Sequence, residues 1–224
     1  MNTRTYSSRL TSEVLNRAIC LQCLKSQVTC YCGEIKKFKT KFKIILLQHP
    51  MERRKAIGTA RMTHLAIENS TLIVGKDFND NPQVNALLRN PELYCVVLFP
   101  GPQSLNLSLL PQHERTTWFP TEKQLVILVI DGTWASAKRM LRQSPNLLEL
   151  PQICFTPQRP SEYKIRQQPK EHCVSSIEAV HQLLEILEPA TRADHLLELF
   201  RGMVELQIRC FEHHHANAAS ARVP

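Results

Sequence analysis

Four short apolar runs, separated by helix-like and irregular segments, constrain the fold of this chain more than any other feature. They are FKIILLQ (42–48), STLIVG (70–75), LYCVVLF (93–99) and LVILVI (125–130). A strand that is apolar at successive positions buries both faces, whereas a half-exposed strand alternates apolar with polar residues. The sequence therefore predicts an α/β domain with a mainly parallel sheet that is flanked by helices.

The segments between and after these runs predict the helices. Residues 50–67, 82–90 and 133–142 are expected to be helical, and two more helices follow a proline-rich crossing that starts at Pro145. The first of these two begins with Ser175 and Glu178, which have the spacing of a capping box. Residues 103–124 are expected to be irregular. The last helix has an apolar stripe that predicts packing against the core, formed by Leu196, Leu199, Phe200, Met203, Val204 and Phe211.

Chemically distinctive residues stand directly after three of the apolar runs. His49 follows the first run, Pro100 and Gly101 follow the third, and Asp131 to Trp134 follow the fourth. Ligands of open parallel sheets bind beyond the carboxyl ends of the strands. We therefore expect these residues to meet at one edge of the sheet and to form one site.

Four of the eight cysteines lie close together in the segment CLQCLKSQVTCYC, namely Cys20, Cys23, Cys30 and Cys32. Four thiolates with this spacing suit a tetrahedral zinc ion, and a site with every position filled by protein is structural. The Cys-x-Cys pair is closer than usual, which keeps an iron–sulfur centre open. A redox pair at Cys20 and Cys23, or a coincidental cluster, is the other alternative.

The net charge of +8 is concentrated near the start of the chain. Residues 1–61 carry 13 Lys and Arg against 3 acids, and the other 163 residues carry 15 against 17. This asymmetry favours a polyanionic partner, because each cation placed on a phosphate releases counterions. A merely solvated basic surface explains the charge alone equally well.

Several classes of protein are excluded or disfavoured by missing signals. The sequence has no Gly-x-Gly-x-x-Gly, no P-loop, no Gly-x-Ser-x-Gly and no His-Glu-x-x-His motif, which disfavours dinucleotide-binding, P-loop, α/β-hydrolase and zincin sites. No apolar run reaches the roughly 18 to 20 residues of a membrane helix, and residues 1–24 do not read as a signal peptide. We therefore expect a cytoplasmic protein without membrane contact.

The segment DGTW (131–134), together with the cysteine cluster, resembles the DTW-domain family of tRNA-uridine aminocarboxypropyltransferases. Further segments match the family in order. HPMERRKAIGTARM (49–62) is similar to its His-Pro-x-Glu and Thr-x-Arg motifs, and LFPG (98–101) to its strand-end loop. YKIRQQP (163–169) and VSSIEA (174–179) resemble its Tyr-x-Ile-Arg and Ser-Thr-x-Glu-Ala segments, with Ser176 in place of the usual threonine.

The resemblance covers about residues 18–207 and implies a substrate pair, S-adenosylmethionine and tRNA. The family moves the 3-amino-3-carboxypropyl group onto N3 of a uridine and releases methylthioadenosine. It also implies a SPOUT-related sheet, whose C-terminal part can be knotted. The division that follows is an N-terminal segment with the four-cysteine zinc element (1–40), a catalytic domain (41–212) and a C-terminal tail (213–224).

Asp131 has two readings. A short acid between a strand and a helix is commonly the helix N-cap. With the family match we expect instead a catalytic carboxylate that accepts or polarises the proton of uridine N3.

The resemblance, with the chemistry of each side chain, also assigns the binding residues. Contacts to S-adenosylmethionine are expected from Phe99, Pro100, Gly101, Gly132, Thr133, Trp134, Ser175, Ser176 and Glu178. Contacts to tRNA are expected from His49, Arg53, Arg61, Lys138, Arg139 and Arg166. Local roles compete with several of these: Thr133 can cap a helix, Trp134 can anchor the core, and the capping box accounts for Ser175 and Glu178.

Two other functions stay open at this point. One is a SPOUT-type RNA methyltransferase, and the other is a non-catalytic zinc-containing protein that binds RNA. The by-product separates them, because methyl transfer releases S-adenosylhomocysteine and a binding protein releases nothing. The sequence does not predict an oligomeric state.

Overall fold

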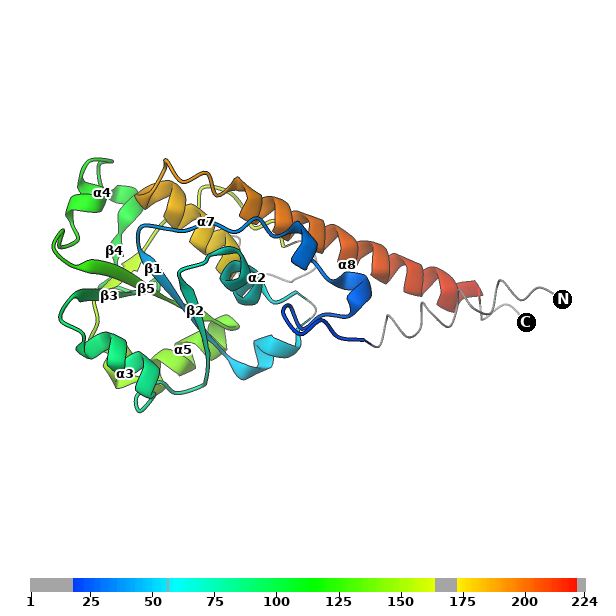
Figure 1. Ribbon diagram of the computed structural model, residues 1–224, viewed down its shortest axis with the longest axis horizontal. Coiled ribbons are helices and arrows are strands. Elements are labelled where there is room, and N and C mark those ends of the chain that lie inside the picture. Colours follow the sequence, from blue (N-terminus) through cyan, green and yellow to red (C-terminus); the bar gives the residue numbers. More distant parts are fainter. Residues whose placement is uncertain (1–17, 56, 164–172, 221–224) are drawn as a thin grey trace.

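The computed structural model describes residues 18–55, 57–163 and 173–220. Its centre is one parallel sheet of six strands in the order β2-β1-β5-β3-β6-β4 (Figure 1). The strands are β1 (Lys43–Gln48), β2 (Ser70–Val74), β3 (Leu93–Leu98), β4 (Leu105–Asn106), β5 (Gln124–Asp131) and β6 (Gln152–Cys154). The predicted α/β class with a parallel sheet is thereby confirmed.

Helices surround this sheet. They are α2 (Thr59–Ala66), α3 (Pro82–Arg89), α4 (Glu114–Thr117), α5 (Trp134–Gln143), α6 (Pro145–Leu148), α7 (Ser176–Leu187) and α8 (Asp194–Ser220). Short 3-10 turns are η1 (Gln27–Thr29), η2 (Cys32–Glu34), η3 (Pro50–Arg54) and η4 (Leu107–Leu109).

Each face of the sheet has its own apolar core, because neighbouring residues of a strand point to opposite faces. Ile44 and Leu46 of β1 lie in a core with α2, α7 and α8, whereas Ile45 and Leu47 lie in a core with α3 and α5. Figure 1 shows α7 and α8 on one side of the sheet and α3 and α5 on the other. The unbroken apolar runs reflect burial on both faces.

Strand β5 holds the centre of the sheet and carries the most apolar run. It pairs with β1 along Lys43–Gln48 and with β3 along Leu93–Leu98. Its last residue, Asp131, lies beside the last residue of β1, Gln48. The register therefore brings two polar side chains together at the carboxyl edge.

Helix α7 is attached to the sheet at both ends. At its end, the buried Glu188 carboxylate accepts the backbone N–H groups of Lys41 at 2.6 Å and Phe42 at 3.2 Å, just before β1. At its beginning, Ser176 contacts the end of β5 at Asp131. The helix thus runs antiparallel to the strands, from the carboxyl end of β5 to the amino end of β1.

Three predictions about elements are wrong. The helix expected over 50–67 is interrupted, since η3 ends at Arg54 and α2 begins at Thr59. The segment 103–124, expected to be irregular, contains β4, η4 and α4, and the proline-rich crossing contains α6 and β6. The two missed strands have only two and three residues and exist by pairing with β6 and β3.

Helix α8 continues past the predicted apolar stripe. Its backbone is helical from Asp194 to Ser220, through the histidines at 213–215 and the position 212 at which the sequence suggested a boundary. Figure 1 shows α8 extending away from the sheet. Among the residues that the structure describes, no helix is both long and apolar enough to span a membrane.

Candidate functional site

Asp131 lies at the carboxyl edge of the sheet and faces α7. Because residues at alternate positions of a strand share a face, Asp131 points to the same side as Val129, which belongs to the core with α7. The residue is only 5% exposed. Gln48 Nε2 donates to one carboxylate oxygen at 2.9 Å, and Ser176 Oγ donates to the other at 2.5 Å.

The donors around this carboxylate offset part of the cost of burying its charge. Hydrogen bonds from donors stabilise a carboxylate relative to the neutral acid. Ser176 is the first residue of α7, and the N-terminal end of a helix carries partial positive charge. Asp131 therefore sits where a buried negative charge is stabilised by two donors and a helix end.

The alternative reading of Asp131 as the N-cap of the following helix is wrong. The N-cap of α5 is Thr133, whose hydroxyl oxygen accepts the N–H of Ser136 at 3.2 Å. Helix α5 packs on the opposite face of the sheet, so the Asp131 side chain points away from it. Thr133 has the capping role that was one of its two readings.

Gly132 allows three segments to approach one another closely. A Cβ atom at this position would lie 3.3 Å from Ser136 Cβ and 3.6 Å from His49 Cβ. His49 is bound to the same edge, since its backbone N–H donates to the Asp131 carbonyl oxygen at 2.8 Å. Its ring Nδ1 accepts the N–H of Met51 at 3.3 Å, which caps η3. The predicted meeting of His49 with the DGTW segment is confirmed.

The loop after β3 reaches the same edge. The rings of Phe99 and Trp134 lie 6.1 Å apart at 58°. The loop is held against β6, because Phe99 N–H donates to the Ile153 carbonyl at 3.0 Å and Ser104 Oγ donates to the Phe99 carbonyl at 2.7 Å. A Cβ atom at Gly101 would lie 3.3 Å from Ser104 Oγ, so this turn is also closely packed. Pro100 is exposed beside it.

Ser175 and Glu178 form the predicted capping box at the start of α7. The Glu178 carboxylate accepts the Ser175 N–H at 2.7 Å. The same carboxylate accepts the Ser161 hydroxyl at 2.9 Å and the Glu162 N–H at 2.7 Å. Glu178 therefore also binds the loop after β6 to the helix, a contact that its spacing in the sequence does not reveal.

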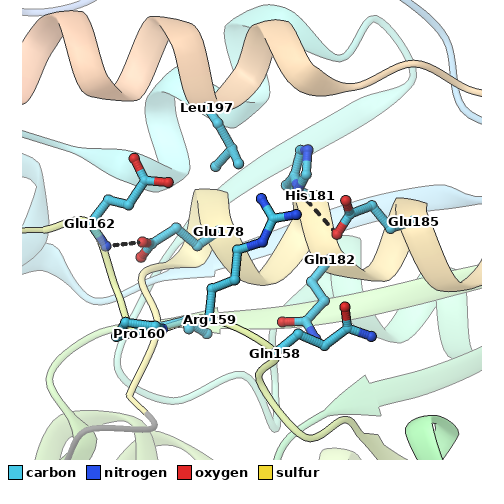
Figure 2. Close-up of a pocket in the computed structure, with 10 residues that line it drawn as sticks. Gln158, Arg159, Pro160, Glu162, Glu178, His181, Gln182, Glu185 and Leu197 are labelled. Carbon is cyan, nitrogen blue, oxygen red and sulfur yellow. Dashed lines mark hydrogen bonds and ion pairs between the residues drawn. The ribbon is translucent and has the colours of Figure 1, made fainter.

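A polar pocket lies beside Glu178, between the loop after β6, α7 and Leu197 of α8 (Figure 2). Figure 2 shows the Arg159 side chain pointing into this pocket toward α7. His181 is buried between two acids. Its Nδ1 lies 3.6 Å from Glu185 Oε2, and its Nε2 lies 3.7 Å from Asp194 Oδ1. Sequence reasoning missed this pocket apart from Glu178. Its other lining residues are Gln158, Pro160, Glu162, Val174 and Gln182.

The four predicted metal ligands meet in one cluster. The Sγ atoms of Cys20, Cys23, Cys30 and Cys32 all lie within 4.8 Å of one another, and two pairs are 3.7 Å apart. Thiolates at about 2.3 Å from one tetrahedral zinc ion lie roughly 3.8 Å from each other. This spacing fits a single ion, whereas a multi-iron cluster must fit several metal and sulfide atoms between its thiolates. The cluster can hold a metal ion such as zinc.

The thiols differ in their tendency to ionise. Backbone N–H groups of Cys23 and Gln22 lower the pKa of Cys20 to about 6. Burial raises the pKa of Cys23 and of Cys32. Since a metal ion binds thiolates, its charge would have to remove the protons of Cys23 and Cys32.

The cysteine element is attached to the segment that follows β1. Arg61 Nη1 of α2 donates to the Gln22 carbonyl at 3.3 Å. Lys25 Nζ donates to the Lys55 carbonyl at the end of η3. Arg61, expected to contact tRNA, thus contacts the cysteine element in this structure.

Three of the other cations expected to contact tRNA are exposed. Arg53 lies in η3, and Lys138 and Arg139 lie on α5. Arg166 lies outside the described residues. Gln48, which contacts Asp131, was not among the predicted site residues.

Comparison with known proteins identifies the domain. Residues 17–208 match the DTW domain. The chain is 30% identical over 176 residues to tRNA-uridine aminocarboxypropyltransferase 2 of Drosophila melanogaster, covering 75% of this chain and 66% of that protein. It is 27% identical over 177 residues to the Mus musculus protein of the same name, covering 77% and 57%.

A plant relative extends the comparison. The chain is 27% identical over 198 residues to tRNA-uridine aminocarboxypropyltransferase A of Arabidopsis thaliana, covering 77% of this chain and 74% of that protein. The match thus spans 57% to 66% of the two animal proteins, and no solved structure matches the chain. The match to the domain covers most of the residues and includes every described site segment, so the chain belongs to the DTW-domain family.

Proposed function

We propose that this protein is a tRNA-uridine aminocarboxypropyltransferase. It transfers the 3-amino-3-carboxypropyl group of S-adenosylmethionine to N3 of a tRNA uridine and releases methylthioadenosine. The names of three relatives support this reaction. The observation that carries the proposal is the buried Asp131 carboxylate, held by Gln48 and Ser176 at the carboxyl edge of a parallel sheet.

Asp131 supplies the acceptor that the reaction needs. Uridine N3 becomes a better nucleophile when its proton is taken or polarised by a positioned carboxylate. N3 then forms a bond to the γ-carbon of the donor, the bond from that carbon to sulfur breaks, and its electron pair stays on sulfur. The N3 proton passes to Asp131, and the rest of the catalytic effect comes from holding the two substrates in line.

Neighbouring groups provide the binding surfaces in this proposal. Phe99 and Trp134 form an aromatic wall at the carboxyl end of the sheet, and such a wall suits the face of adenine or uracil. Ser175 and Ser176, expected to contact the donor, donate their hydroxyl groups to Glu178 at 2.6 Å and to Asp131 at 2.5 Å. We therefore assign both serines to holding these carboxylates at the beginning of α7. In this proposal the backbone at Pro100, Gly101 and Gly132 approaches the donor closely. Thr133 caps α5 and so supports the same end of the sheet.

The basic residues and the cysteine element are assigned to tRNA and to structure. The surplus of cations in residues 1–61 fits an RNA backbone, and Arg53, Lys138 and Arg139 are exposed for it. We assign zinc to the four cysteines as a structural ion, because four thiolates leave no position open for a substrate.

Other parts of the proposal rest on the family match or on the sequence. The SPOUT-related sheet, whose C-terminal part can be knotted, follows from the family. The cytoplasmic location and the division at residues 40 and 212, the latter within helix α8, follow from the sequence. A methyltransferase remains the second candidate only as an outcome of the following test.

Donor molecules labelled at two different positions test the reaction. The protein is incubated with unmodified tRNA and S-adenosylmethionine labelled in its carboxyl group or in its methyl group. Recovery of the carboxyl label on uridine, with methylthioadenosine in solution, is the expected result. Methyl label on the tRNA contradicts the proposal in favour of a methyltransferase, and tRNA binding without either label indicates a binding protein.

A further inference from the structure

We propose that Gln48 is a positioning residue that keeps the Asp131 carboxylate ionised and in a fixed orientation. This role rests on the function proposed above, in which Asp131 accepts the uridine proton. Gln48 does not belong to the residues that the sequence pointed to, and it makes no contact with a substrate in this proposal. It acts through Asp131.

Backbone register places Gln48 where it can do this. Gln48 and Asp131 are sheet partners at the last paired position of β1 and β5, and both point to the side of α7. The sheet backbone therefore fixes the separation of the two side chains. The 2.9 Å bond from Gln48 Nε2 to Asp131 Oδ2 needs no mobile loop.

The orientation of the Gln48 amide depends on the charge of its neighbour. A carboxylate only accepts hydrogen bonds, so the NH2 side of the amide must face it. Ser176 Oγ donates to the other carboxylate oxygen at 2.5 Å. An ionised Asp131 is thus consistent with both of these side-chain neighbours.

The opposite atom of Gln48 shows that fold stability alone does not select this residue. Gln48 is fully buried, and its Oε1 has no hydrogen-bond partner among the described residues. A buried acceptor without a donor is destabilising. Residues that lower stability are expected mainly at functional sites. The unpartnered Gln48 Oε1 beside the Asp131 carboxylate fits such a site.

Other titratable groups around Asp131 have their own contacts. On the end of β1, His49 Nδ1 accepts the Met51 N–H. On α7, the Glu178 carboxylate is turned toward Ser175 and the loop at residues 161–162. Lys138 and Arg139 are exposed on α5 across the sheet. Gln48 and Ser176, in contrast, each donate directly to the Asp131 carboxylate.

Two substitutions change this contact in graded ways. Gln48→Met keeps the length of the side chain and removes the donor, so the pKa of Asp131 rises. Gln48→Glu places a second carboxyl group at hydrogen-bonding distance, and two such groups share one proton at neutral pH. Because the active form is ionised, the acid limb of the rate profile moves to higher pH in the order wild type, Gln48→Met, Gln48→Glu.

The test measures the single-turnover rate of transfer between about pH 5 and pH 9, and the titration of Asp131 by carboxyl-carbon NMR. We expect the midpoint to rise by about 1 unit in Gln48→Met and by about 2 units in Gln48→Glu in both measurements. Gln124→Met is the matched control. Gln124 is exposed at the first position of β5, the strand that ends with Asp131, so its replacement should leave both midpoints unchanged.

The outcomes separate this inference from the proposed function. If wild-type protein transfers nothing at any pH, the proposed function fails, and the NMR midpoint still tests the contact. If the midpoints of the Gln48 variants coincide with that of the wild type, or if their rates fall by one factor at every pH, the inference is wrong. Gln48→Glu preserves the shape of the side chain and gives a second folded variant should Gln48→Met not fold.

Discussion

The edge around Asp131 and the cysteine element are built in opposite ways. Asp131 is held by two strands and the start of a long helix, with an apolar core on each face of the sheet. Residues 18–35 contain two 3-10 turns of three residues each and one isolated bridge between Ile19 and Ser26. Cys23 and Tyr31 are buried against the core, whereas Leu21 is 90% exposed. One region depends on the packed fold, and the other combines a small buried contact with four candidate metal ligands. The difference predicts that chemistry and metal content can be lost separately.

Removing the metal ligands should have the largest effect, and it should stay local. Structural zinc contributes about 10 kcal/mol or more to the folding of small elements. Cys20→Ser should therefore abolish hydrogen-exchange protection in residues 18–35 and weaken tRNA binding. Strand β5 should stay protected, and the rate of transfer at saturating tRNA should be retained. Cys95→Ser, a buried cysteine outside the cluster, is the control. Equal protection of residues 18–35 in both variants would show that the element folds without metal.

Asp131→Asn should have the largest effect on the rate. Loss of a general base typically lowers a rate by about 10² to 10⁴. The fold should persist, because the new amide keeps an acceptor for Ser176 and offers a donor to Gln48 Oε1 after that amide turns. Nucleoside mass analysis and the melting temperature measure the two effects. Asp77 is an exposed acid beyond the carboxyl end of β2, and Asp77→Asn should change neither the rate nor the melting temperature. If Asp131→Asn and Asp77→Asn transferred at similar rates, a catalytic carboxylate at Asp131 would be excluded.

Trp134→Leu should raise the KM of one substrate by about tenfold, since stacking on an aromatic side chain is worth about 1 to 3 kcal/mol. Separate measurements of KM for S-adenosylmethionine and for tRNA show which ring the wall binds. Trp118→Leu removes the second tryptophan of the chain, which is 40% exposed near α4, and should leave both values unchanged. Matching values for the two variants would remove Trp134 from the binding surface.

Lys138→Ala should have the smallest effect. A lysine that contacts one phosphate contributes about 0.7 to 0.9 to the slope of log affinity against log salt. The slope for tRNA should fall by that amount, with transfer at saturating tRNA unchanged. Lys123→Ala, at the exposed amino edge before β5, serves for comparison. An unchanged slope for Lys138→Ala would place RNA away from α5.

The part of the fold that depends on local sequence could be predicted. Four strands were recognisable because their apolar runs are long enough to show burial on both faces. Strands β4 and β6 were not, since two or three residues carry no periodicity and become strands only by pairing with neighbours distant in sequence. The cysteine cluster could be predicted for the same reason. Its ligands lie within 13 residues of sequence, so their meeting does not depend on the rest of the fold.

The contacts of Asp131 show where such prediction ends. Its place at a strand end followed from the sequence, whereas its partners depend on the register of β1 against β5 and on the path of α7. Choosing between cap and site required knowing that α5 and α7 lie on opposite faces of the sheet. Gln48 had no signal beyond being the last polar residue of an apolar run.

The attachment of α7 at both ends limits how the length of this chain can change. From Ser176 to Leu187 the helix rises about 18 Å, close to the roughly 20 Å that six residues of β1 span. One inserted residue would turn Ser176 by about 100° relative to Glu188 and separate one of them from its partner. Insertions should therefore be tolerated in the exposed segment before α4, at residues 111–113, and rejected within α7, whose length is fixed by its two attachments.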